Sequence, residues 1–321
     1  MTEPILSVSD LRVRLKQDPF SYEIVRGVSY DLHAGRTLAL VGESGCGKSL
    51  SALSLLKIQP TPPFLPPEGN VIYRSQNLLK WSEKELQKIR GGKIAMIFQD
   101  PNNALNAVYT IGNQLMEVGL LHLGMDEDQA FARATEVLTS VGIPQAELRM
   151  SDYPHQLSGG MKQRVMIAMA LIAEPDILIA DEPTTALDVT IQAQVLDLLR
   201  EIQERTKMAI LLITHDMGVV AELAHDVAVM YAGSIIEQAS VQSIFDRPLH
   251  PYTQGLFKAF KREGEKGNLS TIKGNVPSSE FIPAGCPFHP RCPFAFNKCY
   301  HGRVPDFKVG EKQSTKCWLY E

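Results

Sequence analysis

The residues from 42 to 49 constrain this chain more than any other stretch, because they fit the phosphate-binding pattern G-x-x-x-x-G-K-[ST]. An apolar run over 37–41 predicts a buried strand before them, and residues 50–57 predict the first turns of a helix after them. The glycines let successive N–H groups point at one anion, and a helix N-terminus adds partial positive charge. This order predicts a nucleoside-triphosphate site rather than a chance glycine turn. The residues expected to contact the nucleotide are Gly42, Glu43, Ser44, Gly45, Cys46, Gly47, Lys48, Ser49 and Leu50.

Two side chains at the end of this pattern carry charge or metal chemistry. Lys48 is expected to reach the β- and γ-phosphates, and the Ser49 hydroxyl is expected to ligate Mg²⁺.

Composition narrows the class of protein. The 321 residues leave room for one large domain and a smaller one, and 44% apolar with 21% charged residues describes an ordinary globular chain. A net charge of −4 argues against a general nucleic-acid binder. The sequence has no apolar run long enough for a membrane span, and residues 1–4 open no signal peptide, so we expect a cytoplasmic chain.

The pattern along the chain alternates strands and helices around a helical block. Strands are predicted over 5–15, 24–32, 93–98, 177–180 and 209–213, and helices within 111–141, over 161–173 and over 189–205. Phe20 and Tyr22 are assigned to a polar connection between the first two strands. The proline-rich residues 60–68 predict a rigid loop. After about residue 245 helical periodicity fades, residues 262–267 read as a solvated linker, and we predict a domain boundary near 245.

Two carboxylates follow the buried strand at 177–180. In a doubly wound sheet, ligands bind at the carboxyl ends of the strands. We therefore expect Asp181 to hold Mg²⁺ through its water shell and Glu182 to polarise the attacking water.

A second anion site is predicted at Ser158, Gly159 and Gly160, where Ser158 caps a helix and exposes N–H groups. Here the sequence resembles the ATP-binding cassette ATPases, whose Leu-Ser-Gly-Gly-Gln signature is matched except for Met161 at the fifth position. The glutamine hydrogen bond at that place is lost.

The resemblance implies further roles for residues in family order. Gln99 matches the loop that senses the γ-phosphate, contributes to the Mg²⁺ site and couples to the transmembrane partner. Asp188 matches the loop that crosses a dimer seam, and His215 matches the switch histidine at the γ-phosphate. Phe20 or Tyr22 is implied to stack on adenine, and the sequence leaves open which.

The resemblance also implies the fold and the stoichiometry. The expected fold is α/β, a P-loop NTPase cassette. Its RecA-like, mostly parallel sheet carries an antiparallel β subdomain and an inserted α-helical subdomain at about 103–165. The cassette is expected over 1–245, followed by a small, irregular, cysteine-containing extension over 246–321. One copy of each motif implies that ATP is sandwiched between two cassettes from two chains, with Lys48, Gln99, Glu182 and His215 as catalytic residues.

The extension has its own pattern. Residues 250–253 and 285–293, with four cysteines, resemble the C-terminal extension of the dipeptide/oligopeptide importer ATPases of the OppD/DppD type. The cysteines are Cys286, Cys292, Cys299 and Cys317, and no C-x₂₋₄-C pair occurs among them. Cytoplasmic location disfavours disulfides, and the prolines after Cys286 and Cys292 are similar to the Cys-Pro of ferredoxins. We expect a structural [4Fe–4S] cluster, with zinc as the runner-up and free thiols as the third reading.

The leading functional hypothesis is an ATPase that powers a di- or oligopeptide importer at the cytoplasmic face of the cell membrane. The resemblance implies a second ATPase subunit, usually a paralogue, two transmembrane permease subunits, an extracytoplasmic substrate-binding protein and no nucleic acid. An importer for nickel or another small solute remains open. Two hypotheses belong to different classes. One is a soluble cassette ATPase acting on nucleic acid, which usually has paired cassettes, long coiled-coil insertions or basic modules. The other is a partner-regulating or metal-sensing protein, in which the cysteines matter more than the ATP site.

Overall fold

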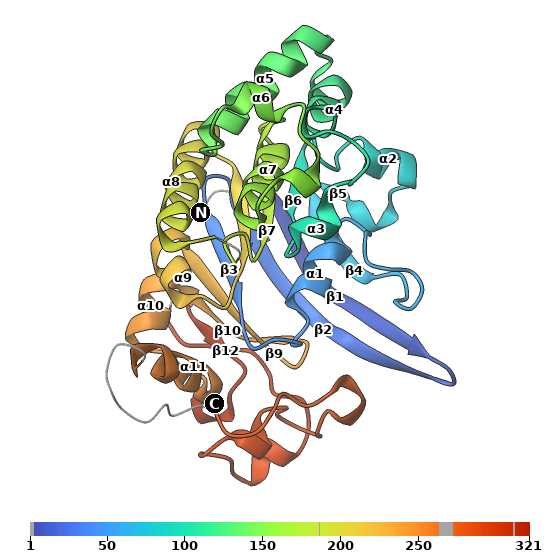
Figure 1. Ribbon diagram of the computed structural model, residues 1–321. Coiled ribbons are helices and arrows are strands. Elements are labelled where there is room, and N and C mark those ends of the chain that lie inside the picture. The colour runs from blue at the N-terminus through green and yellow to red at the C-terminus, as the bar shows by residue number, and fades with distance from the viewer. Residues whose placement is uncertain (1–2, 186, 263–271, 311) are drawn as a thin grey trace. The chain divides into compact units, whose positions relative to one another are not determined.

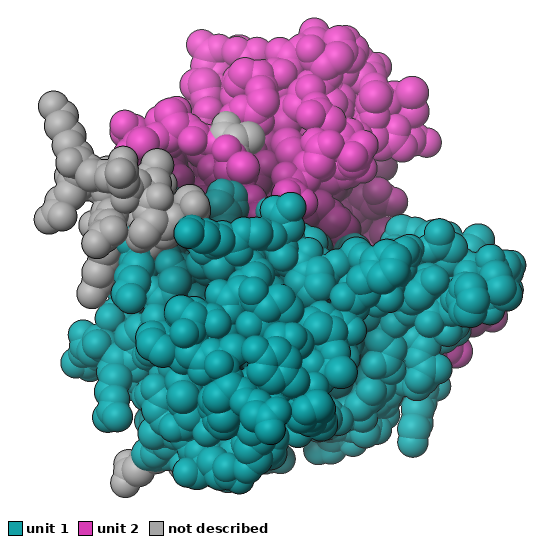
Figure 2. All heavy atoms as spheres, turned by 90° about the horizontal axis from the view of Figure 1, so that it is seen from below, with its two compact units in different colours: residues 1–32, 38–80, 214–321 teal, residues 33–37, 81–213 magenta. Residues whose placement is uncertain are grey.

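The computed structural model describes residues 3–185, 187–262, 272–310 and 312–321. It divides into two compact units, coloured teal and magenta in Figure 2. Unit 1 holds residues 1–32, 38–80 and 214–321, and unit 2 holds residues 33–37 and 81–213. Within the described residues, no helix is both long and apolar enough to cross a membrane.

An antiparallel sheet in unit 1 is built from the first half of its sequence (Figure 1). Its order is β2 (Phe20–Leu32), β1 (Leu6–Gln17), β4 (Glu68–Tyr73) and β5 (Gln76–Asn77). Alternating apolar residues in β1 bury one face, with Leu11 and Val13 fully buried. The prediction that Phe20 and Tyr22 lie in a connection is wrong. Both belong to β2 and pair with residues of β1, Phe20 with Gln17 and Tyr22 with Leu15. Only two residues separate the strands, so the hairpin continues pairing to its tip.

A second set of strands in unit 1 carries the phosphate loop. Buried β3 (Thr37–Val41) pairs in parallel with β9 (Asp226–Tyr231), and antiparallel pairing continues through β10 (Ser234–Ser240), β12 (Ser314–Thr315) and β11 (Phe307–Lys308). The helices of this unit are α1 (Lys48–Leu55), α9 (Met217–Leu223), α10 (Val241–Asp246) and α11 (Pro251–Arg262). Short 3₁₀ turns cover Leu78–Lys80, Ser279–Phe281, His289–Arg291, Asn297–Tyr300 and Trp318–Tyr320.

Helix α11 corrects the expectation that helical structure fades after residue 245. Its 12 residues begin at Pro251, where the missing N–H of proline costs nothing. Glu237 of β10 accepts hydrogen bonds from the N–H groups of Leu249 and His250, each at 2.8 Å, directly before the helix. This anchor is tertiary, so local periodicity does not reveal it. Most of the predicted linker, residues 263–267, lies outside the described residues.

Unit 2 contains a parallel sheet and the helical block. Strands β6 (Ile94–Ile97), β7 (Ile177–Asp181) and β8 (Ala209–Ile213) pair in that order, and all residues of β7 and β8 are buried. The predicted apolar strands are thereby confirmed. The helices are α2 (Glu83–Gln87), α3 (Pro101–Ala104), α4 (Ile111–Leu123), α5 (Glu127–Ser140), α6 (Ala146–Arg149), α7 (Gly159–Leu171) and α8 (Val189–Thr206), with a 3₁₀ turn at Pro154–Gln156.

Local signals explain where these helices begin and end. Thr110 caps α4, an Asp126–Gln129 capping box begins α5, and Gly124 ends α4 in the left-handed region. The helical block predicted within 111–141 consists of these two helices, separated by the connection that begins at Gly124.

Candidate functional site

The phosphate loop connects β3 to α1 in unit 1. Gly42 leaves the buried strand so close to β9 that a Cβ there would lie 2.2 Å from the carbonyl oxygen of Met230. Gly47 caps α1 with φ of +101°, a conformation that favours glycine. The close approach of β9 therefore requires glycine at position 42, and the backbone conformation favours glycine at position 47.

Lys48 lies in the loop that it is predicted to serve. It is buried at 8% exposure, and its ammonium donates to the carbonyl oxygens of Gly42 at 2.8 Å and Glu43 at 3.1 Å. Cys46 lies beside it, with Sγ 3.7 Å from Lys48 Nζ. Burial raises the pKa of the Cys46 thiol, and the nearby ammonium opposes that rise only in part.

Two residues of the C-terminal extension hold the loop, a role that the sequence analysis did not predict for them. Arg291 donates to both carboxylate oxygens of Glu43, at 2.7 and 2.9 Å, and to the hydroxyl of Tyr231 at 3.3 Å. The hydroxyl of Tyr252 accepts from the N–H of Glu43 at 2.8 Å. The Glu43 carboxylate raises the pKa of Arg291, whose side chain is only 7% exposed. The second residue of the loop is therefore fixed at its backbone and at its side chain.

The carboxylate pair of unit 2 stands at the end of β7. Asp181 is the last residue of that strand and is 3% exposed. Glu182 follows with φ of +50°, and the Thr185 hydroxyl donates to its Oε2 at 2.9 Å. The N–H of Glu182 donates to Ile213 of β8 at 2.8 Å. The two carboxylates thus occupy the strand-end position that the sequence predicted, and their catalytic roles stay predictions.

Gln99 and His215 are exposed side chains that follow strands. Gln99 comes after β6 in unit 2, and Asp100 beside it caps α3 through the N–H of Asn102 at 2.9 Å. His215 belongs to unit 1, one residue before Asp216, which caps α9. Of the three predicted Mg²⁺ ligands, Ser49 lies in unit 1, and Gln99 and Asp181 lie in unit 2.

The Ser-Gly-Gly segment begins α7 in unit 2. Ser158 caps the helix, its hydroxyl accepting from the N–H of Met161 at 3.3 Å, as predicted. Ser158 and Gly159 are exposed, and a Cβ built on Gly159 would have no neighbour within 4 Å. Packing inside the described chain therefore does not require glycine at 159. A residue that the sequence did not point to is Gln163, which is 1% exposed and donates to the carbonyl oxygen of Pro183 at 2.7 Å. It ties α7 to the loop that follows Glu182.

Asp188 and Phe20 are two further predicted site residues that the structure describes. Asp188 caps α8 by accepting from the N–H of Ile191 at 3.0 Å. Phe20 is 63% exposed and its ring centroid lies 6.4 Å from that of Tyr22. Ser44 and Gly45 line a cavity of about 220 Å³, and neither Phe20 nor Tyr22 is among its lining residues.

The four C-terminal cysteines line one small cavity in unit 1, of about 10 Å³. None of the four forms a disulfide with a described cysteine. Burial, with added repulsion between neighbouring thiolates, raises the pKa of the Cys286 and Cys317 thiols to about 11. Donor number and kind fit a group held by four thiolates. The four side chains are not arranged around a common metal position. Within the described residues, no three His, Cys, Asp or Glu side chains are placed to hold a metal ion.

A phosphate loop behind a parallel strand, carboxylates at a strand end and a capped Ser-Gly-Gly helix together define a nucleotide-binding cassette. The chain matches the family model of the ABC transporter over residues 25–185, and that of the oligopeptide/dipeptide transporter C-terminal region over residues 236–299. It belongs to the ATP-binding cassette ATPases of the dipeptide and oligopeptide transport group.

Relatives extend this match to the whole chain. The chain is 46% identical over 320 residues to the dipeptide transport ATP-binding protein DppD of Bacillus subtilis, covering 99% of this chain and 96% of that protein. It is 46% identical to the oligopeptide transport ATP-binding protein OppD of Haemophilus influenzae, covering 98% of this chain and 97% of that protein.

Solved cassettes share the fold. A dimeric post-hydrolysis structure of the ATP-binding cassette MJ0796 bound to ADP and Pi superposes with a TM-score of 0.67 at 26% identity, covering 74% of this chain and 98% of that chain. CbiO1 of Clostridium perfringens, part of the transporter complex cbiONQ, gives a TM-score of 0.63 at 26% identity, covering 84% and 98%. The predicted cassette fold is confirmed.

Proposed function

We propose that this ATPase drives import of di- or oligopeptides, as one of two cassettes docked on a permease at the cytoplasmic face of the cell membrane. The observation that carries the proposal is the full-length similarity to dipeptide and oligopeptide transport subunits, which includes the C-terminal region as well as the cassette. We place the cassette in residues 1–245, with its helical subdomain at about 103–165, and the extension in 246–321. An extracytoplasmic binding protein would deliver the cargo.

Hydrolysis follows from the residues in the two units. Lys48 and the loop N–H groups would hold the phosphates. Ser49, Gln99 and Asp181 would hold Mg²⁺, which would supply positive charge to the phosphate groups when bound. Glu182 accepts a proton from the attacking water as general base. His215 contacts the γ-phosphate, and Phe20 or Tyr22 stacks on adenine.

A second cassette completes the site in this proposal. Its residues equivalent to Ser158, Gly159, Gly160, Met161 and Asp188 contact the ATP held by this chain, and these residues of this chain contact the ATP of the partner. The open space around Gly159 supports this arrangement, because the absence of a side chain there serves no contact within the described chain.

Transport by inverted membrane vesicles that contain the complete complex tests the cargo. We expect ATP-dependent movement of a labelled dipeptide in the presence of the binding protein, and none with the Lys48→Ala variant. ATP-dependent movement of nickel with no movement of peptides would replace the peptide proposal by the nickel alternative. ATPase activity stimulated by DNA or RNA without any permease would replace the importer by the nucleic-acid class.

We also propose that Cys286, Cys292, Cys299 and Cys317 hold a [4Fe–4S] cluster of structural role. Four thiols around one cavity support this, and the extension has few buried apolar residues of its own. A cluster would stabilise such a segment by joining its distant parts.

Metal analysis of anaerobically purified protein tests the cluster. We expect a brown protein with about four iron and four sulfide per chain, and loss of the iron in Cys299→Ser. The matched control Cys46→Ser removes a buried thiol outside the cavity and should keep the iron. Colourless protein with stoichiometric zinc would establish zinc instead, and protein without metal would establish free thiols.

A further inference from the structure

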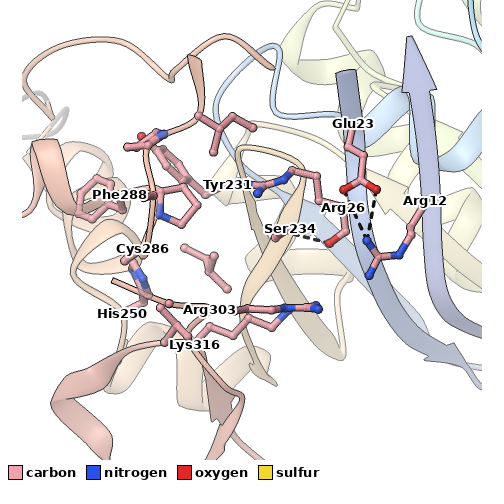
Figure 3. Close-up of a pocket in the computed structure, with 18 residues that line it drawn as sticks. Arg12, Glu23, Arg26, Tyr231, Ser234, His250, Cys286, Phe288, Arg303 and Lys316 are labelled. Carbon is pink, nitrogen blue, oxygen red and sulfur yellow. Dashed lines mark hydrogen bonds and ion pairs between the residues drawn. The ribbon is translucent and has the colours of Figure 1, made fainter. Parts of the chain in front are cut away.

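A second, larger cavity of about 560 Å³ lies in unit 1, apart from the phosphate loop residues (Figure 3). Three parts of the chain line it: the hairpin β1–β2, the strands β9 and β10, and the C-terminal extension. Its volume is in the range of small-molecule sites. None of the roles proposed above uses this cavity as a binding site.

Four cationic side chains line this cavity against one carboxylate. The cations are Arg12, Arg26, Arg303 and Lys316, and the carboxylate is Glu23. Arg12 is already paired, since its guanidinium lies 3.3 Å from Glu23 and 2.9 Å from Asp10.

The other three cations have no acceptor for their side chains in the described part of the chain. Figure 3 shows Arg26 reaching into the cavity from β2, while Arg303 and Lys316 lie close together on the side of the extension. Asp10 acts on Arg303 and on Lys316, and Asp306 acts on Lys316, through the longer-range field alone. A site with three unpaired positive charges results.

This arrangement is costly without an anion. Arg26 is half-buried, and burial lowers the pKa of its guanidinium. The field of Glu23 opposes this shift in part, and the like charges of Arg303 and Arg12 add to it. A guanidinium stays charged under all physiological conditions, so the cost is not relieved by losing a proton. Low-dielectric walls focus such a field into the cavity, and an anion that enters pairs with charges that otherwise repel one another.

The remaining wall is apolar. Ile282, Phe288 and Val304 line it, and Phe288 and Val304 are buried to 2% and 6% exposure. Inorganic phosphate alone would leave this surface without a contact.

We propose that this cavity binds a small amphiphilic anion, one per chain. Its carboxylate or phosphate group pairs with Arg26, Arg303 and Lys316. Its apolar part lies against Ile282, Phe288 and Val304.

Calorimetric titration of the full-length chain tests the site, with MgADP in excess so that the phosphate loop is not available to the probes. The probes are phenyl phosphate and phenylacetate, with neutral phenylacetamide as their control. We expect at least one of the two anions to bind with a stoichiometry of one, about tenfold or more tighter than the amide, and more weakly as salt increases. The better of the two anions identifies the head group as phosphate or carboxylate.

Variants locate the binding. Arg303→Gln changes an exposed side chain and Lys316→Gln a half-buried one, and each should weaken the anion by about tenfold. Lys308→Gln, an exposed cation of β11 that does not line the cavity, should change nothing. If Lys316→Gln fails to fold, Arg303→Gln decides. Anions that bind no better than the amide, or that bind Arg303→Gln as tightly as the original chain, overturn the proposal.

Discussion

Glu182 illustrates how a single residue is prepared for chemistry. Its φ of +50° belongs to the left-handed region, which a residue other than glycine or asparagine enters at a cost of about 1–3 kcal/mol. The hydrogen bonds from its own N–H to Ile213 and from Thr185 to its carboxylate hold it in that conformation. Backbone strain of this kind concentrates at functional sites.

We predict that Glu182→Gln lowers the rate of ATP hydrolysis by the assembled complex by about 10²- to 10⁴-fold, since the amide is no base. Phosphate release measures the rate. The affinity for MgATP should stay nearly unchanged, because the phosphate loop is intact. The matched control is Glu174→Gln, whose carboxylate pairs with Arg133 and Arg205 on the surface and which should keep full activity. Full activity of Glu182→Gln would refute the assignment.

The sequence located residues correctly where their placement follows local spacing, and the roles of these residues stay predictions. The glycines of the phosphate loop, the carboxylates after β7 and the cap at Ser158 all stand within a few residues of the elements that place them. Arg291 was missed because 248 residues separate it from Glu43, and no local pattern reports a contact at that distance. The adenine-stacking aromatic stays undecided between Phe20 and Tyr22.

At the scale of elements, the N-terminus of α7 has an observed cap and a proposed contact with ATP, and a matched pair of variants separates the two. Ser158→Ala and Thr110→Ala each remove a side-chain cap, at 3.3 and 3.2 Å respectively, so each should lower the free energy of unfolding by about 1 kcal/mol. Only Ser158→Ala should also weaken ATP-dependent pairing of cassettes and hydrolysis. Chemical denaturation and hydrolysis assays measure the two effects. Equal hydrolysis in both variants would reduce Ser158 to a cap.

The link between the extension and the phosphate loop yields a stability prediction. Arg291→Gln and Glu43→Gln, made singly and together, should give a coupling energy of about 2 kcal/mol, because the Arg291 side chain is buried and its pairing is bidentate. The same cycle on the exposed pair Arg200–Asp197 should give about 0.5 kcal/mol or less. We expect the Arg291 variant also to bind ATP severalfold more weakly. A coupling energy no larger than that of the surface pair would show that the loop does not depend on this contact.

The anchor of α11 makes stability depend on pH. Burial raises the pKa of Glu237 above its ordinary value of 4.5, despite the N–H groups that donate to it. The Glu237 carboxyl therefore stays protonated to a higher pH in the folded chain than in the unfolded chain. The contribution of this carboxyl group to the free energy of unfolding is fully present below pH 4.5 and is lost as the pH rises through the raised pKa. Glu237→Gln lacks this proton, so thermal unfolding from pH 4.5 to about 7 should show the original chain losing stability relative to the variant. If the unfolding temperatures of the two proteins change with pH in parallel, the raised pKa of Glu237 is contradicted.

Elements were predicted well where one segment contains its own signal, and poorly where another segment supplies it. The apolar runs 177–180 of β7 and 209–213 of β8 predict strands by themselves, and every residue of both strands is buried. Helix α11 depends on Glu237 of β10, and the hairpin tip at Phe20 depends on pairing with β1. Contacts between segments distant in the sequence determine both features, so a local pattern does not predict them.

For the whole molecule, the two units divide the proposed machinery. The phosphate loop and His215 belong to unit 1, whereas Asp181, Glu182 and the Ser-Gly-Gly helix belong to unit 2. Similarity over 99% of the chain joins them in one family. The sequence gives no cargo, because the residues discussed here bind ATP and not a transported solute.

The mass of the Glu182→Gln variant in solution tests the central claim most directly. Light scattering would be recorded with the partner cassette that co-purifies from the native membrane, with and without MgATP. The account predicts a stable pair of cassettes only when ATP is bound, with two nucleotides trapped per pair. Separate cassettes that each hold ATP at full occupancy would contradict it.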